Sequence, residues 1–82
     1  MEADHITTLS AVTVVAIAAG LRAVEAVEAV EGQGIDGLRP LLYRAGRDAC
    51  RRVMSPPVGW ARDHLRTAAP WWSSFERWVA CG

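Results

Sequence analysis

Apolar positions gather at the start of the chain in one unbroken run. The sixteen residues from Ile6 to Leu21 include no charged side chain, no amide side chain and no proline. A helix of that length measures about 24 Å, short of the roughly 30 Å hydrocarbon core of a bilayer. Extending the run to Val24 adds one charge, Arg22, and gives a mean hydropathy of about 1.8, which is typical of spanning helices. The pattern therefore predicts a helix inserted in a membrane.

Beyond the apolar run the pattern still favours helix. Valine and glutamate each recur at every third position from Val24 to Glu31, among residues of high helix propensity, until Gly32 and Gly34. We therefore expect one long helix from about Asp4 to Val30. Its first part is apolar all round, as in lipid or a buried core, and its last two turns are amphipathic.

A second helix is expected from Leu38 to Met54, after the glycines. Asp36 is a candidate N-cap, and Pro40 suits the first turn, where a missing N–H costs nothing. The sequence Ser55-Pro56-Pro57 stops the helix.

Further short helices are expected from about Gly59 to Ala68 and after Pro70. The predicted fold class is all-α: one long N-terminal, single-pass transmembrane helix followed by two or three short amphipathic helices. The chain then divides into a membrane-anchor helix with a polar extension (residues 1–31), a glycine-rich hinge (32–37) and an arginine- and tryptophan-rich tail (38–82).

Three groups of residues are candidates for contacts with partners or lipid. Small residues on one side of the long helix would let another backbone approach closely. Arginines opposite the apolar stripe of the second helix would contact an anionic surface, such as lipid headgroups, or simply face water. Aromatic residues on one face of the last helix would be buried in the headgroup zone, in a partner or in the core of a monomer. The small residues are Ala16, Ala19, Gly20 and Ala23, the arginines are Arg44, Arg47, Arg51 and Arg52, and the aromatic residues are Trp71, Trp72, Phe75 and Trp78.

Charge is divided unevenly along a chain that is neutral overall. Residues 1–38 carry six acids against one arginine, whereas residues 39–82 carry eight arginines against three acids, so the two parts have net charges of −5 and +5. A neutral total with acids inside the basic part does not favour nucleic-acid binding.

No catalytic or metal-binding signature accompanies these patterns. Cys50 and Cys81 fit no metal spacing and are either free thiols or a disulfide pair. His5 and His64 lack further ligands at suitable spacing, and no histidine lies inside the apolar run. We expect no cofactor, no metal and no small-molecule substrate.

The sequence thus predicts a small accessory subunit, structural or assembly-related, of a larger membrane complex, such as a bioenergetic one. Its partners would be other subunits of that complex and lipid headgroups. Arg22 and Arg39 follow the apolar run and no Lys or Arg precedes it, so the C-terminal tail is expected on the cytoplasmic, matrix or stromal side. The alternatives are a soluble helical interaction module that packs with itself or a partner and, third, a holin- or toxin-like membrane-active protein.

Overall fold

The first helix ends at a glycine cap inside the predicted long helix. In the computed structural model, which describes residues 2–81, the amide of Gly20 donates to the carbonyl oxygen of Ile17 (3.0 Å) and that of Leu21 to Ala16 (2.8 Å). This pair of bonds forms a Schellman motif, which needs a left-handed residue at the position of Gly20. Glycine adopts the observed φ of +78° without the steric penalty of a Cβ. The prediction of one helix from Asp4 to Val30 is therefore wrong.

Regular structure between residues 2 and 81 is entirely helical, as predicted. In chain order the elements are α1 (Glu2–Ala18), α2 (Ala23–Gln33), the 3₁₀ turn η1 (Ile35–Gly37), α3 (Leu38–Ala45), α4 (Arg47–Cys50), the 3₁₀ turns η2 (Arg51–Met54) and η3 (Pro56–Val58), α5 (Gly59–Ala68) and α6 (Trp72–Ala80). Over these residues, no helix has both the length and the apolar character that a membrane crossing requires. The predicted spanning helix therefore finds no support in the fold.

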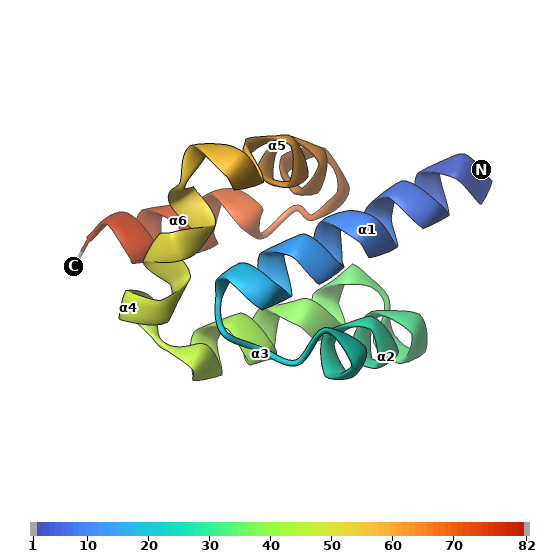
Figure 1. The fold of residues 1–82 in the computed structure, drawn as a ribbon, viewed down its shortest axis with the longest axis horizontal. Helices are drawn as coiled ribbons and strands as arrows, with labels where there is room; N and C mark the ends of the chain where they lie inside the picture. Colours follow the sequence, from blue (N-terminus) through green and yellow to red (C-terminus); the bar gives the residue numbers. More distant parts are fainter. Residues whose placement is uncertain (1, 82) are drawn as a thin grey trace.

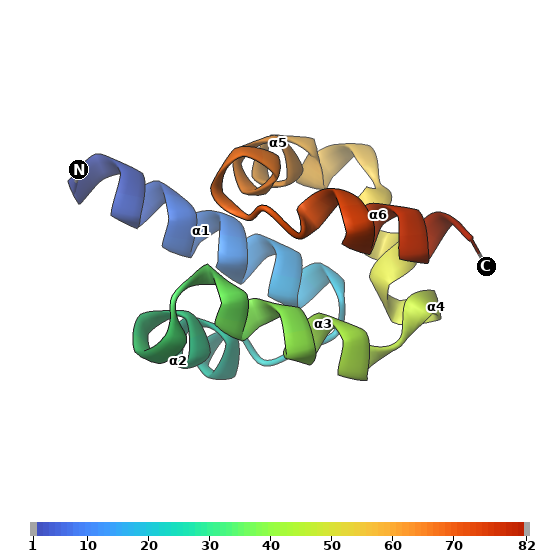
Figure 2. The ribbon, with the colours of Figure 1, turned by 180° about the vertical axis from the view of Figure 1, so that it is seen from behind.

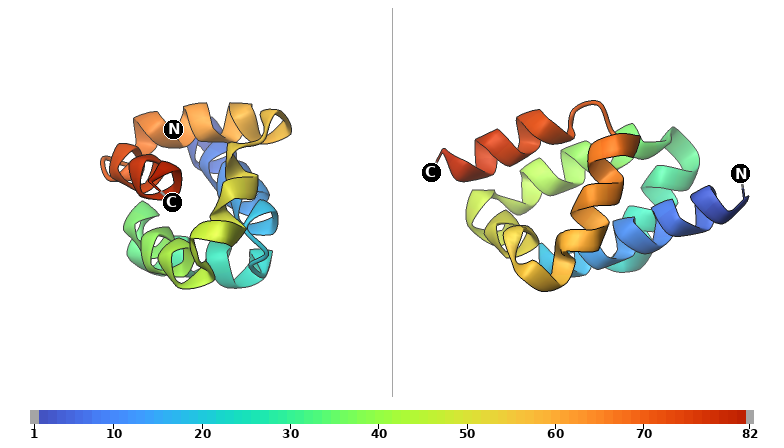
Figure 3. Two further views of the ribbon diagram at one scale, coloured as in Figure 1. Left: turned by 90° about the vertical axis from the view of Figure 1, so that its left-hand side faces the viewer. Right: turned by 90° about the horizontal axis from the view of Figure 1, so that it is seen from above.

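The apolar helix α1 contacts two other helices of the fold. It passes between α5 on one side and α2 on the other, as Figures 1 and 3 show. One face of α1 is fully or almost fully buried, and its residues recur at helical spacing. They are Ala11, Val12, Val15 and Ala16, and the buried Ala19 follows directly after the helix.

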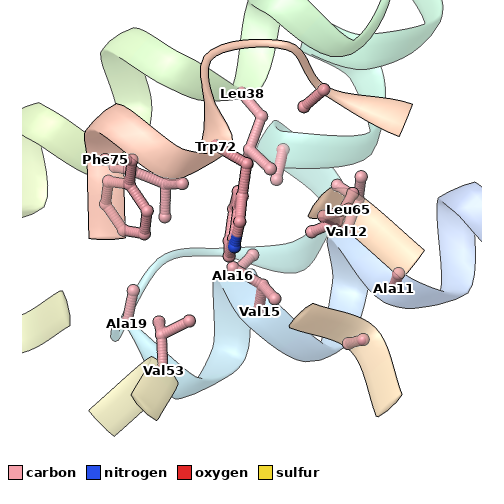
Figure 4. Packing of buried hydrophobic residues seen from close by; sticks show 14 of the residues in the cluster. Ala11, Val12, Val15, Ala16, Ala19, Leu38, Val53, Leu65, Trp72 and Phe75 are labelled. Atoms are coloured by element: carbon pink, nitrogen blue, oxygen red, sulfur yellow. The ribbon is translucent and has the colours of Figure 1, made fainter. Parts of the chain in front are cut away.

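The aromatic part of the core comes from α6. Trp72 and Phe75 have no exposed surface. Figure 4 shows the indole of Trp72 standing on α1, with its nitrogen directed toward Ala16 and with Leu65 of α5 on the other side of the ring from Phe75. The small side chain of Ala16 makes room for the largest buried side chain, so the alanine-rich run and the tryptophan-rich tail form one core.

The predicted second helix is interrupted. It begins at Leu38 as expected but ends at Ala45, because Gly46 takes a φ of +98° that breaks the helical path. The chain resumes as α4 and η2 and stops at Ser55, before the two prolines. The helix expected from Gly59 to Ala68 is confirmed as α5.

The glycine-rich segment makes a close contact with α2. Gly37 is buried, and a Cβ placed on it would lie 2.5 Å from the carbonyl oxygen of Ala29. The side chain of Asp36, expected as an N-cap, makes no capping bond, so that prediction is wrong. Its Oδ1 instead accepts a hydrogen bond from the indole N–H of Trp71 (3.0 Å), which ties this segment to the chain before α6.

One ion-pair cluster joins α5 to α6. Nε and Nη2 of Arg66 donate to the two carboxylate oxygens of Glu76 (3.0 and 3.1 Å), while Nη1 donates to Asp63 (2.8 Å). The hydrogen bond and charge of Glu76 raise the pKa of the Arg66 guanidinium above its ordinary value. Asp63 is therefore engaged by Arg66, one turn along its own helix.

Candidate interaction surface

The predicted aromatic face divides between core and surface. Trp72 and Phe75 are fully buried and Trp71 is 7% exposed, whereas Trp78 is half-buried. A partner that binds this fold without rearranging it would therefore reach Trp78 and not the first three. In the described structure most of the aromatic face is the chain's own core.

Trp78 belongs to a row of neighbouring rings and guanidinium groups along the seam between α3 and α6. These two helices lie side by side in Figures 2 and 3. The Cζ atom of Arg39 lies 5.6 Å from the ring centre of Tyr43 and 5.8 Å from that of Trp71. Both distances are within cation–π range. Arg39 is exposed and Tyr43 is half-buried, so this end of the row faces solvent.

The row continues to the end of α6. The ring centres of Tyr43 and Trp78 are 4.5 Å apart, with the planes tilted by 48°. The Cζ atom of Arg47 lies 5.2 Å from the ring centre of Trp78, and its Nε donates to the carbonyl oxygen of the same residue (2.8 Å). We call these five residues, Trp71, Arg39, Tyr43, Trp78 and Arg47, the arginine-aromatic row.

Buried contacts hold the row in place from behind. Phe75 packs edge-on against Tyr43, with ring centres 5.9 Å apart, and against Trp71 at 6.4 Å. Asp36 fixes the indole of Trp71 through the hydrogen bond described above. The geometry of the row therefore follows from the core and needs no partner.

Arg39 and Tyr43 were not candidates in the sequence, although a signal for them exists. They are four residues apart and lie on one edge of α3, where the side chains at i and i+4 are neighbours. The sequence pattern placed arginines on a polar face and aromatic residues on a different helix. That the two groups meet depends on how α3 and α6 pack.

The four arginines predicted to contact an anionic surface do not share one helical face. Arg44 lies on α3 and donates to Glu25 of α2 (3.3 Å), and Arg47 belongs to the arginine-aromatic row. Arg51 pairs with Asp48, and Arg52 is exposed on η2. The break at Gly46 separates the first of them from the other three.

The predicted face of small residues is also divided. Ala16 and Ala19 are buried in the core, and Ala16 lies under Trp72 (Figure 4). Gly20 is exposed at the cap of α1, and Ala23 is half-buried in α2. The close approach expected from small residues occurs at Ala16, where the neighbour is the chain's own Trp72.

A hollow of about 390 Å³ lies between α1 and α5. In its lining, Thr8 Oγ1 and His64 Nε2 are 2.7 Å apart and share a hydrogen bond. Which of the two donates depends on the imidazole tautomer. Asp4, Thr67 and Ala68 complete the lining. Over residues 2–81, no three His, Cys, Asp or Glu side chains are grouped so that they could hold a metal ion.

The two cysteines are free thiols in different surroundings. Cys50 is buried, and its Sγ donates to the carbonyl oxygen of Leu42 (3.2 Å). Burial raises the pKa of this thiol, because the thiolate would lose its hydration. Cys81 is exposed near the end of the chain.

Comparison of the chain with protein-family models, with curated proteins and with solved structures finds no match.

Proposed function

We propose that this chain is a small helical interaction module that binds a partner protein and has no catalytic activity of its own. The observation that carries the proposal is the arginine-aromatic row. Arginine, tyrosine and tryptophan are enriched in the central part of protein interfaces and among the residues that dominate binding energy. Along the seam these residue types are arranged together at the surface.

The rigidity of the row supports the same proposal. Side chains that are ordered only on binding cost about 0.5 to 1.5 kcal/mol each in lost rotamer freedom. Here Phe75 and Asp36 already hold the rings, and the Arg47 side chain is fixed by its bond to the backbone of Trp78. A partner would therefore meet a surface whose ordering cost has largely been met by folding.

A matched pair of tryptophan variants tests the proposal. The tagged full chain would be crosslinked in the cells that produce it, and captured proteins would be compared between wild type, Trp78→Ala and Trp60→Ala. Trp60 is the control because it is 49% exposed on α5 and takes no part in the row. Loss of a hot-spot tryptophan commonly costs about 2 kcal/mol or more, near thirtyfold in affinity, so Trp78→Ala should lose the partner and Trp60→Ala should keep it.

Thermal unfolding of the same variants shows whether a variant loses the partner only because it no longer folds. Trp78→Ala keeps the backbone carbonyl that accepts from Arg47, and Trp78 is only half-buried, so the variant should remain folded. Retention of the partner by folded Trp78→Ala, or its equal loss from both variants, would refute a role for the row in binding.

A second candidate is the membrane-complex subunit predicted from the apolar run, which a different observation favours. Ile6 and Ile17 are each 62% exposed, and they are about three helical turns apart, so they lie on one side of α1. This strip would rest on lipid or on an apolar membrane partner. Flotation with lipid vesicles tests it: wild type should float, and an Ile6→Gln, Ile17→Gln double variant should not. Wild type that stays at the bottom of the gradient rules this candidate out.

A further inference from the structure

We infer that the partner contacts the arginine-aromatic row with an acidic segment, and that one of its carboxylates pairs with Arg39. The inference rests on the proposed function and adds to it the chemistry of the partner. It depends on three properties of the row: the unused hydrogen-bond donors of Arg39, the charges near it and the limited exposure of the rings.

Arg39 differs from the other arginines near the seam. Arg44, Arg47 and Arg51 each donate to an oxygen atom of the chain, at Glu25, Trp78 and Asp48 respectively. Among residues 2–81, the interactions of Arg39 are its two cation–π contacts, with Tyr43 and Trp71.

Cation–π contacts with rings leave the N–H groups of a guanidinium, which lie in its own plane, available to other acceptors. A carboxylate accepts two parallel hydrogen bonds in that plane, which is the strongest arrangement available to arginine. Because Tyr43 and Trp71 already restrict the side chain, Arg39 is oriented before a carboxylate arrives.

The charge around the row favours an anionic ligand. The part of the chain from residue 39 onward has a net charge of +5. Neither of two acids that precede residue 39 pairs with Arg39: Glu25 pairs with Arg44, and Asp36 keeps its charge but accepts from the indole of Trp71. The positive charge of Arg39 therefore has no acidic partner among the described residues.

The arrangement of the rings favours a protein carboxylate over a nucleic acid. Proteins that bind single strands offer aromatic faces on which bases stack. Here the ring of Tyr43 has Arg39 and Trp78 as neighbours, and Trp71 is only 7% exposed. The chain as a whole is neutral, whereas sequence-independent binding of a polyanion depends on many positive charges.

Binding of defined probes to the full chain tests the inference. The first probe is a short peptide that alternates glutamate with leucine, and its control carries glutamine in place of glutamate. A single-stranded oligonucleotide and vesicles that contain anionic lipid are the competing probes. Calorimetry at two salt concentrations should show that the glutamate peptide binds, that the glutamine peptide binds at least about tenfold more weakly, and that salt weakens the binding.

Three arginine variants locate the contact. Arg39→Gln should weaken the glutamate peptide at least about tenfold, as expected for the loss of a charge-assisted hydrogen bond. Arg39→Lys should retain part of the affinity, because an ammonium keeps the charge but lacks the planar fork. Arg22→Gln removes the same charge from an exposed site in the turn between α1 and α2 and should leave the affinity unchanged.

Equal affinity for the two peptides would overturn the inference, as would an effect of Arg22→Gln as large as that of Arg39→Gln. Tighter binding of the oligonucleotide or the vesicles, lost in Arg39→Gln, would show a phosphate ligand instead. If the partner captured in cells depends on Trp78 but not on Arg39, the interaction module stands and the acidic partner is refuted.

Discussion

Substitution of Gly37 by alanine should strongly destabilise the protein, although its backbone angles predict the reverse. Gly37 has φ −65° and ψ −23°, a helical conformation in which alanine is normally preferred over glycine. In the folded chain, however, a Cβ at this position would lie 2.5 Å from the carbonyl oxygen of Ala29 and 2.9 Å from its carbonyl carbon. Both are backbone atoms of α2, so neither can move aside as a side chain would.

The size of the effect follows from this collision. Inserting a methyl group into a closely packed site costs about 1 to 3 kcal/mol. Because the two nearest atoms belong to the backbone of Ala29, we expect Gly37→Ala near the upper end of that range. A chain of this length has a total stability of about 4 to 12 kcal/mol. Each kcal/mol shifts the melting temperature of a small domain by about 4 to 8 °C, so we expect a fall of at least about 12 °C.

Gly32→Ala provides the matched control. Gly32 lies in α2, and apart from its chain neighbours and the backbone of its own helix no heavy atom lies within 4 Å of an added Cβ. The same substitution should therefore stabilise the protein by about 0.4 to 1 kcal/mol. Thermal unfolding followed by far-ultraviolet circular dichroism measures both variants. A Gly37→Ala protein that melts with or above the wild type would refute the close approach of η1 to α2.

Three further predictions test the cap, the core and the buried thiol. Gly20→Ala should destabilise by about 1 to 2 kcal/mol in chemical denaturation, because alanine must adopt the left-handed conformation; no loss would mean that α1 and α2 can be continuous. Trp72→Ala should cost about 3 to 5 kcal/mol, whereas Trp60→Ala, at 49% exposure, should melt close to wild type; equal melting of the two would contradict the core position of Trp72. Because burial raises the pKa of Cys50, the unfolded chain loses this thiol proton at lower pH than the folded chain. Stability should therefore fall as pH rises past the ordinary thiol pKa, and a wild-type fall no larger than that of Cys50→Ala would contradict this.

The parts of the fold that local chemistry determines could be predicted from the sequence. The boundaries of α5 follow from the prolines before it and from the amphipathic pattern between Gly59 and Ala68. The start of α3 at Leu38 and the stop before Pro56 have the same origin. Each of these signals acts within a few residues, so its effect does not depend on how the rest of the chain packs.

The break in the N-terminal helix shows where such signals become ambiguous. Gly20 follows three apolar residues in a run without charge, where glycine is equally typical of a helix that packs closely in a membrane and of a helix cap. The cap prevails in this fold because it lets α2 turn back onto α1, so that Ala26 and Val30 are buried. That gain comes from tertiary packing, which the sequence pattern around Gly20 does not contain.

The candidate surface was less predictable than the fold, for a related reason. The sequence identifies arginine and tryptophan as the notable residues of the tail but separates them onto different helices. Their meeting at the seam depends on the packing of α3 against α6, which the contact of the buried Phe75 with Tyr43 helps to determine. Trp78 was predicted as an interface residue and Arg47 as a surface contact, whereas Arg39 and Tyr43 enter only through the packing.

The same packing gives one explanation for two features that separately suggested a membrane. An apolar helix rich in alanine needs a neighbour that brings large apolar area, because alanine itself offers little. Tryptophans gathered in a short tail need a surface that lets their rings approach closely. Trp72 on Ala16 meets both needs at once (Figure 4), since a larger residue at position 16 would occupy the space of the indole. In this chain the aromatic tail covers the apolar run and the apolar run covers the aromatic tail, so lipid is not needed to explain the burial of either one.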